Sequence, residues 1–139
     1  MKKVCLLVLF GMTTAAIVMP AQSAYGVAAF RKEFEAKYVK KEPTTDAEKN
    51  LLAAVTKVKC NVCHVGKKKK DRNAYGVALS KELTKKDAKN VEKIQTALDK
   101  VAGLKADPDD PSSPTFGELI QQGQLPGGDE AAATSATGN

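Results

Sequence analysis

Hydrophobic residues recur with helical spacing along most of the chain, and no segment alternates apolar and polar residues as a half-buried strand does. A first amphipathic helix is predicted up to about residue 40, with Pro43 closing it. Its apolar side chains are Val27, Phe30, Phe34 and Tyr38. Thr45 and Glu48 match a capping box, which predicts a second helix that runs directly into Cys60. The apolar face of that helix comprises Leu51, Leu52, Val55 and Val58.

Three shorter helices are predicted in the second half of the chain, after a polar loop over residues 65–72. Asn73 is placed to cap the first of them, which carries Tyr75, Leu79 and Leu83. The next helix carries Val91, Ile94, Leu98 and Val101, and Gly103 is its expected stop. A connector with three prolines leads to a last short helix with Phe116, Leu119 and Ile120. The pattern predicts an all-α fold: a small domain of four to five short helices.

The first 24 residues have the organisation of a secretory signal. A basic start and an apolar stretch over residues 4–19 are followed by a proline and by small residues that end at Ala24. The stretch is shorter than the roughly 20 residues that a membrane-spanning helix needs. We therefore expect cleavage near Ala24 and a periplasmic or otherwise exported protein, without stable membrane insertion after cleavage. An uncleaved anchor is the alternative.

Three segments follow from these patterns: a signal over residues 1–24, a helical domain over residues 25–126, and a tail over residues 127–139. The tail is rich in Gly, Ala, Ser and Thr and has no apolar pattern, so it is expected to be flexible and disordered. Cleavage of the signal also changes the inventory of reactive side chains. Cys5 and all three methionines lie within it, which leaves two cysteines, one histidine and no methionine.

The charge is basic but modest. The sequence has 22 Lys and Arg against 16 Asp and Glu, and without Lys2 and Lys3 the excess falls from six to four. Seven of the basic residues stand between Lys57 and Arg72, with one acid among them. Such a run is either a solvated loop or a positive surface that steers an acidic partner. It lacks interleaved aromatic residues on which bases could stack, so we expect no nucleic-acid partner.

The candidate chemistry lies in one pentapeptide, Cys60-Asn61-Val62-Cys63-His64. C-x-x-C-H is the haem-attachment signature of c-type cytochromes, and at these five residues the chain resembles a small monohaem c-type cytochrome. The resemblance implies one covalent haem c, with thioethers at Cys60 and Cys63 and His64 as an axial ligand of the iron. It also implies a cytochrome c-like domain whose helices surround the haem. The spacing suits this chemistry, since thiols three residues apart on a helical turn reach the two vinyl groups on one porphyrin edge.

Three other interpretations compete for the same residues. A structural zinc site needs four Cys or His ligands, and the cleaved chain offers three. A thioredoxin-like redox site belongs in a βαβ setting, and no strand is predicted. A structural disulfide between Cys60 and Cys63 suits an exported protein, but it closes a very short loop and does not explain His64.

The second axial position of the iron is the main departure from the family. After cleavage the chain has neither the methionine nor the second histidine that commonly fills it. Three arrangements stay open: an exposed face that holds water or a small ligand, ligation by the new N-terminal amine, or ligation by a lysine. The lysines close enough in sequence are Lys67, Lys68, Lys69, Lys70, Lys81, Lys85 and Lys86. We expect an open or weakly ligated iron.

The resemblance implies electron transfer rather than catalysis as the most direct function. The expected partner is a redox protein, acidic at its contact surface, that docks near the basic residues 67–72. An open distal face would instead allow small-ligand binding or peroxidase-like chemistry. A haem subunit of a larger redox complex and a secreted helical protein without haem are the remaining alternatives.

Overall fold

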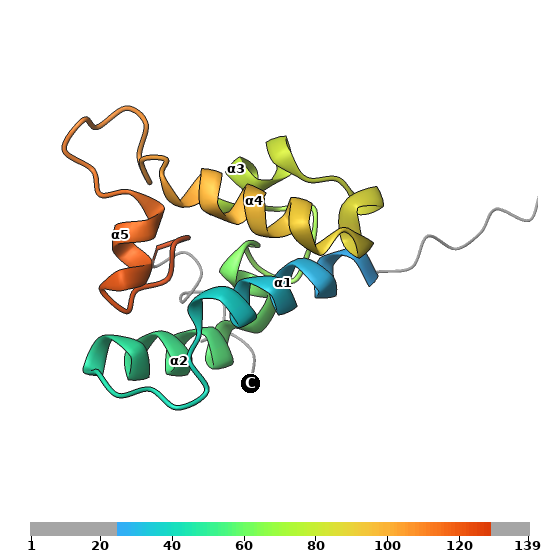
Figure 1. The fold of residues 1–139 in the computed structure, drawn as a ribbon. Helices are drawn as coiled ribbons and strands as arrows, with labels where there is room; N and C mark the ends of the chain where they lie inside the picture. The colour runs from blue at the N-terminus through green and yellow to red at the C-terminus, as the bar shows by residue number, and fades with distance from the viewer. Residues whose placement is uncertain (1–24, 129–139) are drawn as a thin grey trace, which may run out of the picture.

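The computed structural model describes residues 25–128, with side chains from Ala28 onward. The predicted secretory signal lies outside the described residues, as does the predicted tail apart from Gly127 and Gly128. Every regular element between residues 25 and 128 is helical, which confirms the all-α prediction (Figure 1). The elements are α1 (Tyr25–Tyr38), α2 (Asp46–Val58), the 3-10 helix η1 (Lys59–Val62), α3 (Ala74–Glu82), the 3-10 helix η2 (Lys85–Lys89), α4 (Val91–Ala102) and α5 (Phe116–Gln121). None of these helices combines the length and the apolar character that a membrane crossing requires.

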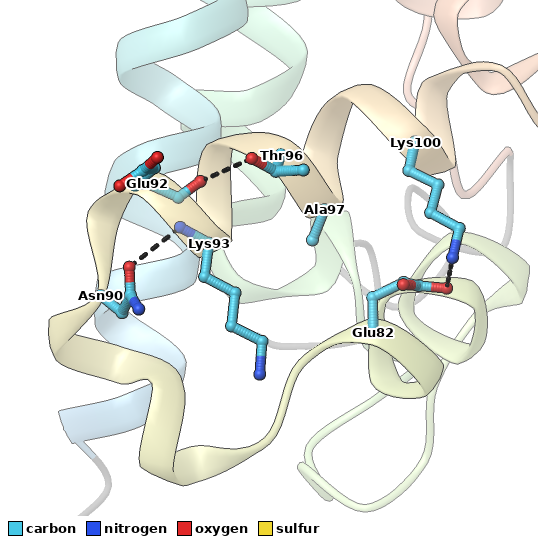
Figure 2. A pocket seen from close by; sticks show the side chains of 7 residues that line it. All are labelled: Glu82, Asn90, Glu92, Lys93, Thr96, Ala97 and Lys100. Carbon is cyan, nitrogen blue, oxygen red and sulfur yellow. Dashed lines mark hydrogen bonds and ion pairs between the residues drawn. The ribbon is translucent and has the colours of Figure 1, made fainter.

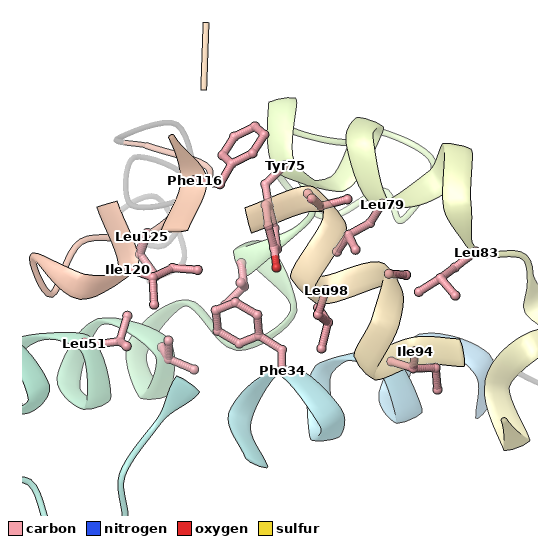
Figure 3. Packing of buried hydrophobic residues seen from close by; sticks show 14 of the residues in the cluster. Phe34, Leu51, Tyr75, Leu79, Leu83, Ile94, Leu98, Phe116, Ile120 and Leu125 are labelled. Atoms are coloured by element: carbon pink, nitrogen blue, oxygen red, sulfur yellow. The ribbon is translucent and has the colours of Figure 1, made fainter. Parts of the chain in front are cut away.

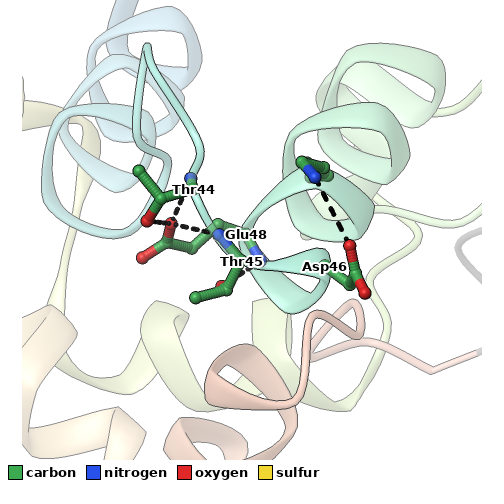
Figure 4. Close-up of polar contacts among 5 residues, drawn as sticks. Thr44, Thr45, Asp46 and Glu48 are labelled. Carbon is green, nitrogen blue, oxygen red and sulfur yellow. Dashed lines mark hydrogen bonds and ion pairs between the residues drawn. The ribbon is translucent and has the colours of Figure 1, made fainter.

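The start of α2 has the predicted capping box (Figure 4). The backbone N–H of Glu48 donates to Thr45 Oγ1 at 3.3 Å, and Glu48 Oε2 accepts from the backbone N–H of Thr45 at 3.2 Å. The same carboxylate oxygen accepts from the backbone N–H of Thr44 at 2.8 Å. Hydrogen bonding by Lys40 and by these backbone groups lowers the pKa of Glu48 to about 2. The cap therefore keeps its charge through the neutral and mildly acid range.

The other helix ends agree only in part with those predicted from the sequence. Asn73 caps α3 and Gly103 closes α4, both as predicted. The predicted helix end near residue 40 is two residues late, since α1 stops at Tyr38. The helix η2 was not predicted, although Thr84 forms a capping box with Asp87 at its start.

The core lies where α4 packs against α1, α3 and α5 (Figure 3). Tyr75 is fully buried at its centre, with its ring 5.8 Å from that of Phe34 and 5.2 Å from that of Phe116, both edge-on. Other buried members include Leu51, Val55, Val58, Val62, Leu79, Leu83, Ile94, Leu98, Val101, Ile120 and Leu125. Val91 shares the apolar spacing of α4 but is 51% exposed, because it is the first residue of the helix and lies beyond the packed turns.

Ile94 and Val91 form a matched pair for testing this packing, since both lie on α4 and only Ile94 is fully buried. Ile94→Ala should lower the free energy of unfolding by about 2–5 kcal/mol through lost burial and the cavity it leaves. Val91→Ala should change it by less than about 0.5 kcal/mol. Urea unfolding followed by circular dichroism measures both. Equal losses in the two variants would contradict the observed orientation of α4.

Candidate functional site

The Cys60–His64 pentapeptide begins where α2 ends. The sequence predicted that the second helix runs directly into Cys60, whereas α2 stops at Val58 and Cys60 lies in η1. Between them, Lys59 has φ +51° and ψ −112°, an unusual conformation for a residue with a side chain. Such backbone costs roughly 1–3 kcal/mol and persists only where the surroundings hold it. Here the buried Val58 and Val62 anchor the chain on either side.

The basic loop after the pentapeptide returns to its starting point. His64 and Arg72 form an isolated antiparallel bridge, and the backbone N–H of Val65 donates to the Asp71 carbonyl at 3.0 Å. The loop is tied once more where the Asp71 N–H donates to the Lys68 carbonyl. Its lysines are exposed while His64 is buried, with 6% of its surface accessible. The imidazole therefore enters the interior at the base of a cationic loop.

Helix α3 then packs directly against the pentapeptide. A Cβ atom added at Gly76 would lie 1.9 Å from the carbonyl oxygen of Cys63, so only glycine allows this approach. Asn73 bonds to the same segment through its side chain and its backbone. The first turn of α3 thus fixes one side of the two-cysteine segment.

Cys60, Cys63 and His64 all line one cavity of about 870 Å³. This volume lies in the range of about 300–1,000 Å³ that small-molecule and cofactor sites occupy. Segments far apart in sequence form it: α1, the pentapeptide and its loop, α3, and the start of η2. Its apolar wall consists of Ala28, Phe30, Phe34, Val62, Leu79 and Leu83.

Positive charge surrounds this apolar space. Arg31 pairs with the one carboxylate among the lining residues, Glu35, at 2.6 Å. Six further lining cations are exposed, and none has an ion-pair partner among residues 28–128. These are Lys32, Lys59, Lys69, Lys70, Arg72 and Lys85, which we call the cationic rim. An apolar cavity with such a rim suits a flat apolar molecule that carries carboxylates.

The environment of Cys63 does not favour a reactive thiolate. Burial raises the pKa of Cys63 to about 12, with Cys60 adding to the rise and Arg72 opposing it. Cysteines that act as nucleophiles or exchange disulfides have a lowered pKa instead. Both cysteines are free thiols in the structure.

His64 is suited to metal ligation. Burial lowers the pKa of its imidazole, the Asp71 backbone acts in the opposite direction, and the cations Lys69 and Arg72 add to the lowering. The ring is therefore neutral at pH 7, the form in which histidine binds metals. Its Nδ1 atom is buried and has no hydrogen-bond partner in the described part of the chain. A buried polar atom without a partner is costly, and a bound group would remove that cost.

These residues fit a covalently attached haem. Two free thiols, a neutral imidazole with an unpaired nitrogen, an apolar cavity and a cationic rim correspond to the vinyl groups, iron, ring and propionates of haem. A metal ion held by side chains alone fits less well. Among residues 28–128, no three His, Cys, Asp or Glu side chains lie close enough together to hold one.

The lysines that the sequence proposed as iron ligands divide into those that line the cavity and those that do not. Lys69, Lys70 and Lys85 line it, whereas Lys67, Lys68, Lys81 and Lys86 do not. Lys32 and Lys59 line it as well, although the sequence named neither as a candidate iron ligand. No local pattern marks Lys32, because it reaches the cavity only through the packing of α1 beside η1 and η2.

A second hollow of about 390 Å³ lies between the end of α3 and α4 (Figure 2). Its two lysines are already neutralised, since Lys100 pairs with Glu82 at 2.8 Å and Lys93 with Asp87 at 2.7 Å. The one other charged side chain that lines the hollow is the exposed carboxylate of Glu92, and we assign the hollow no role.

Comparisons of this chain with protein-family models, with curated proteins and with solved structures found no match.

Proposed function

We propose that this chain is an exported monohaem c-type cytochrome that carries electrons. The observation that carries the proposal is that Cys60, Cys63 and His64 line one apolar cavity large enough for a cofactor. The C-x-x-C-H spacing alone is a five-residue signal. Its coincidence with an apolar cavity, an unpaired imidazole nitrogen and unpaired cations is independent support.

Each residue then has a defined task. Cys60 and Cys63 hold the porphyrin edge through thioether bonds, and His64 ligates the iron. Bound haem supplies a one-electron ferric/ferrous couple. The apolar wall, with Phe30, Phe34 and Leu79 among its members, excludes water from the ring and lowers the local dielectric constant.

The cationic rim has two tasks in this proposal. Some of its members neutralise the haem propionates, and the others attract an acidic redox partner to the cavity mouth. Only Lys69, Lys70 and Arg72 of the basic residues 67–72 line the cavity, so the docking surface extends onto Lys32 and Lys85 as well. The predicted signal over residues 1–24 supports a periplasmic or otherwise exported location, where covalent attachment takes place.

A second candidate function is small-ligand binding or peroxide chemistry at an open iron face. The residues that line the cavity include no second histidine and no methionine. The lysines that line it are exposed to water, and a lysine must lose a proton to ligate against a reference pKa of about 10.4. Ala28 lies near the predicted cleavage site and lines the cavity, so the new N-terminal amine stays a candidate.

Covalent attachment predicts the behaviour of cysteine variants. Protein from a host competent for cytochrome c maturation should stay coloured in a denaturing gel stained for haem. Cys60→Ala and Cys63→Ala should each leave at most one thioether, and the double variant should lose the pigment. Ser80→Ala is the control, because Ser80 lines the cavity outside the pentapeptide. A colourless wild type with a Cys60–Cys63 disulfide would refute the proposal.

An open iron face predicts rapid binding of carbon monoxide by the ferrous protein and a spectrum that is partly high-spin at pH 7. A fully low-spin protein indifferent to carbon monoxide would instead indicate an internal amine ligand. Lys32→Ala, Lys59→Ala, Lys69→Ala, Lys70→Ala and Lys85→Ala would then locate it, with Lys68→Ala as a control away from the cavity. If all these variants stayed low-spin, the ligand would be the N-terminal amine.

A further inference from the structure

Asn73 contacts the cysteine segment more extensively than a helix cap requires. Its Oδ1 accepts from the Gly76 N–H at 2.9 Å, which is the ordinary capping bond of α3. Its Nδ2 also donates to the carbonyl oxygens of Asn61 at 3.2 Å and Val62 at 3.0 Å. Its backbone N–H donates to the carbonyl of Cys63 at 3.3 Å. Asn73 thus binds three consecutive carbonyls: those of the two residues between the cysteines, and that of Cys63, which precedes His64.

The surroundings hold Asn73 tightly in this position. The residue is 1% exposed, and a Cβ atom added at Gly127 would lie 2.0 Å from its Nδ2 atom. On the far side, Gly76 brings the backbone of α3 against the Cys63 carbonyl. The amide of Asn73 therefore has little room to turn away. Its bonds to the Val62 carbonyl and the Gly76 N–H are buried, and a buried hydrogen bond is worth more than one at the surface.

We propose that Asn73 is a positioning residue that sets the Cys60–His64 segment in its attachment geometry before haem binds. This inference rests on the proposed function. Two thioethers and an axial ligand must meet one rigid porphyrin, so a segment fixed in advance loses less conformational entropy on attachment. Asn73 binds backbone carbonyls of the segment, while the side chains of Cys60, Cys63 and His64 line the cavity.

Asn73→Asp separates positioning from capping. Aspartate keeps the shape and the capping oxygen of asparagine, but it loses both N–H donors and sets a carboxylate against two carbonyl oxygens. Asn90→Asp is the matched control, because Asn90 is exposed, caps α4 in the same way, and its side chain has no hydrogen bond among residues 28–128 other than this cap. Gly127→Ala disturbs the Asn73 amide from outside and leaves Asn73 unchanged, while Gly103→Ala meets only an ordinary contact of 3.6 Å.

Two readouts apply to the purified full-length product from a maturation-competent host. The absorption band of the pyridine complex moves to longer wavelength when one vinyl group stays unattached. Cleavage by trypsin after Lys59 reports opening of the segment. We expect Asn73→Asp and Gly127→Ala to shift the band and to accelerate this cleavage by about tenfold or more, because the loss of one of the two Nδ2 hydrogen bonds already changes the open population by roughly that factor. Both control variants should behave as wild type.

Wild-type attachment and wild-type cleavage in Asn73→Asp would overturn the inference while leaving the haem proposal intact. If Asn73→Asp does not accumulate, wild-type attachment and wild-type cleavage in Gly127→Ala would overturn the inference. A colourless wild type would overturn the proposed function and with it a role in attachment. The cleavage rate would then still decide whether Asn73 holds the segment, and equal rates in Asn73→Asp and Asn90→Asp would refute that too.

Discussion

The contact between the first turn of α3 and the two-cysteine segment determines the geometry of the candidate site. Asn73 binds the carbonyls of residues 61–63, and Gly76 allows the helix backbone to approach Cys63 at a distance that any Cβ atom would prevent. The contact lies at the carboxyl end of the segment, and the residue with positive φ, Lys59, precedes its amino end. Without it the pentapeptide would be a loop between two helices, free to point its thiols and its imidazole in different directions.

The other helices complete the cavity around this segment and give it an apolar wall and a cationic rim. Phe34 takes part in both the core and the cavity wall, so the packing of α1 against α3 and α4 also sets the width of the cavity. The cations of the rim stay unpaired although acidic residues are common elsewhere on the surface, where Asp87, Glu82 and Asp99 each pair with a lysine. The six rim cations therefore stay available for an anionic group at the cavity.

The sequence was a good guide to local structure and a poor one to the cavity. Helical spacing and the caps at Thr45 and Asn73 predicted the main helices because they depend on near neighbours. The pentapeptide also indicated the candidate site by itself, since C-x-x-C-H is the haem-attachment signature. Lys32 and the wall formed by Phe30 and Leu83 could not be predicted, because they join the site only through contacts between distant segments. The turn at Lys59 was missed for another reason: lysine gives no signal for positive φ.

The cavity between α1, η1, α3 and η2 is proposed to hold a haem bound to Cys60, Cys63 and His64. A crystal structure of the coloured protein from a maturation-competent host tests it most directly. We predict a porphyrin against Phe34 and Leu79, two thioether bonds and iron bonded to His64, with the Asn73 bonds to residues 61–63 unchanged. A cavity closed by side chains, with a disulfide joining Cys60 and Cys63, would contradict this account.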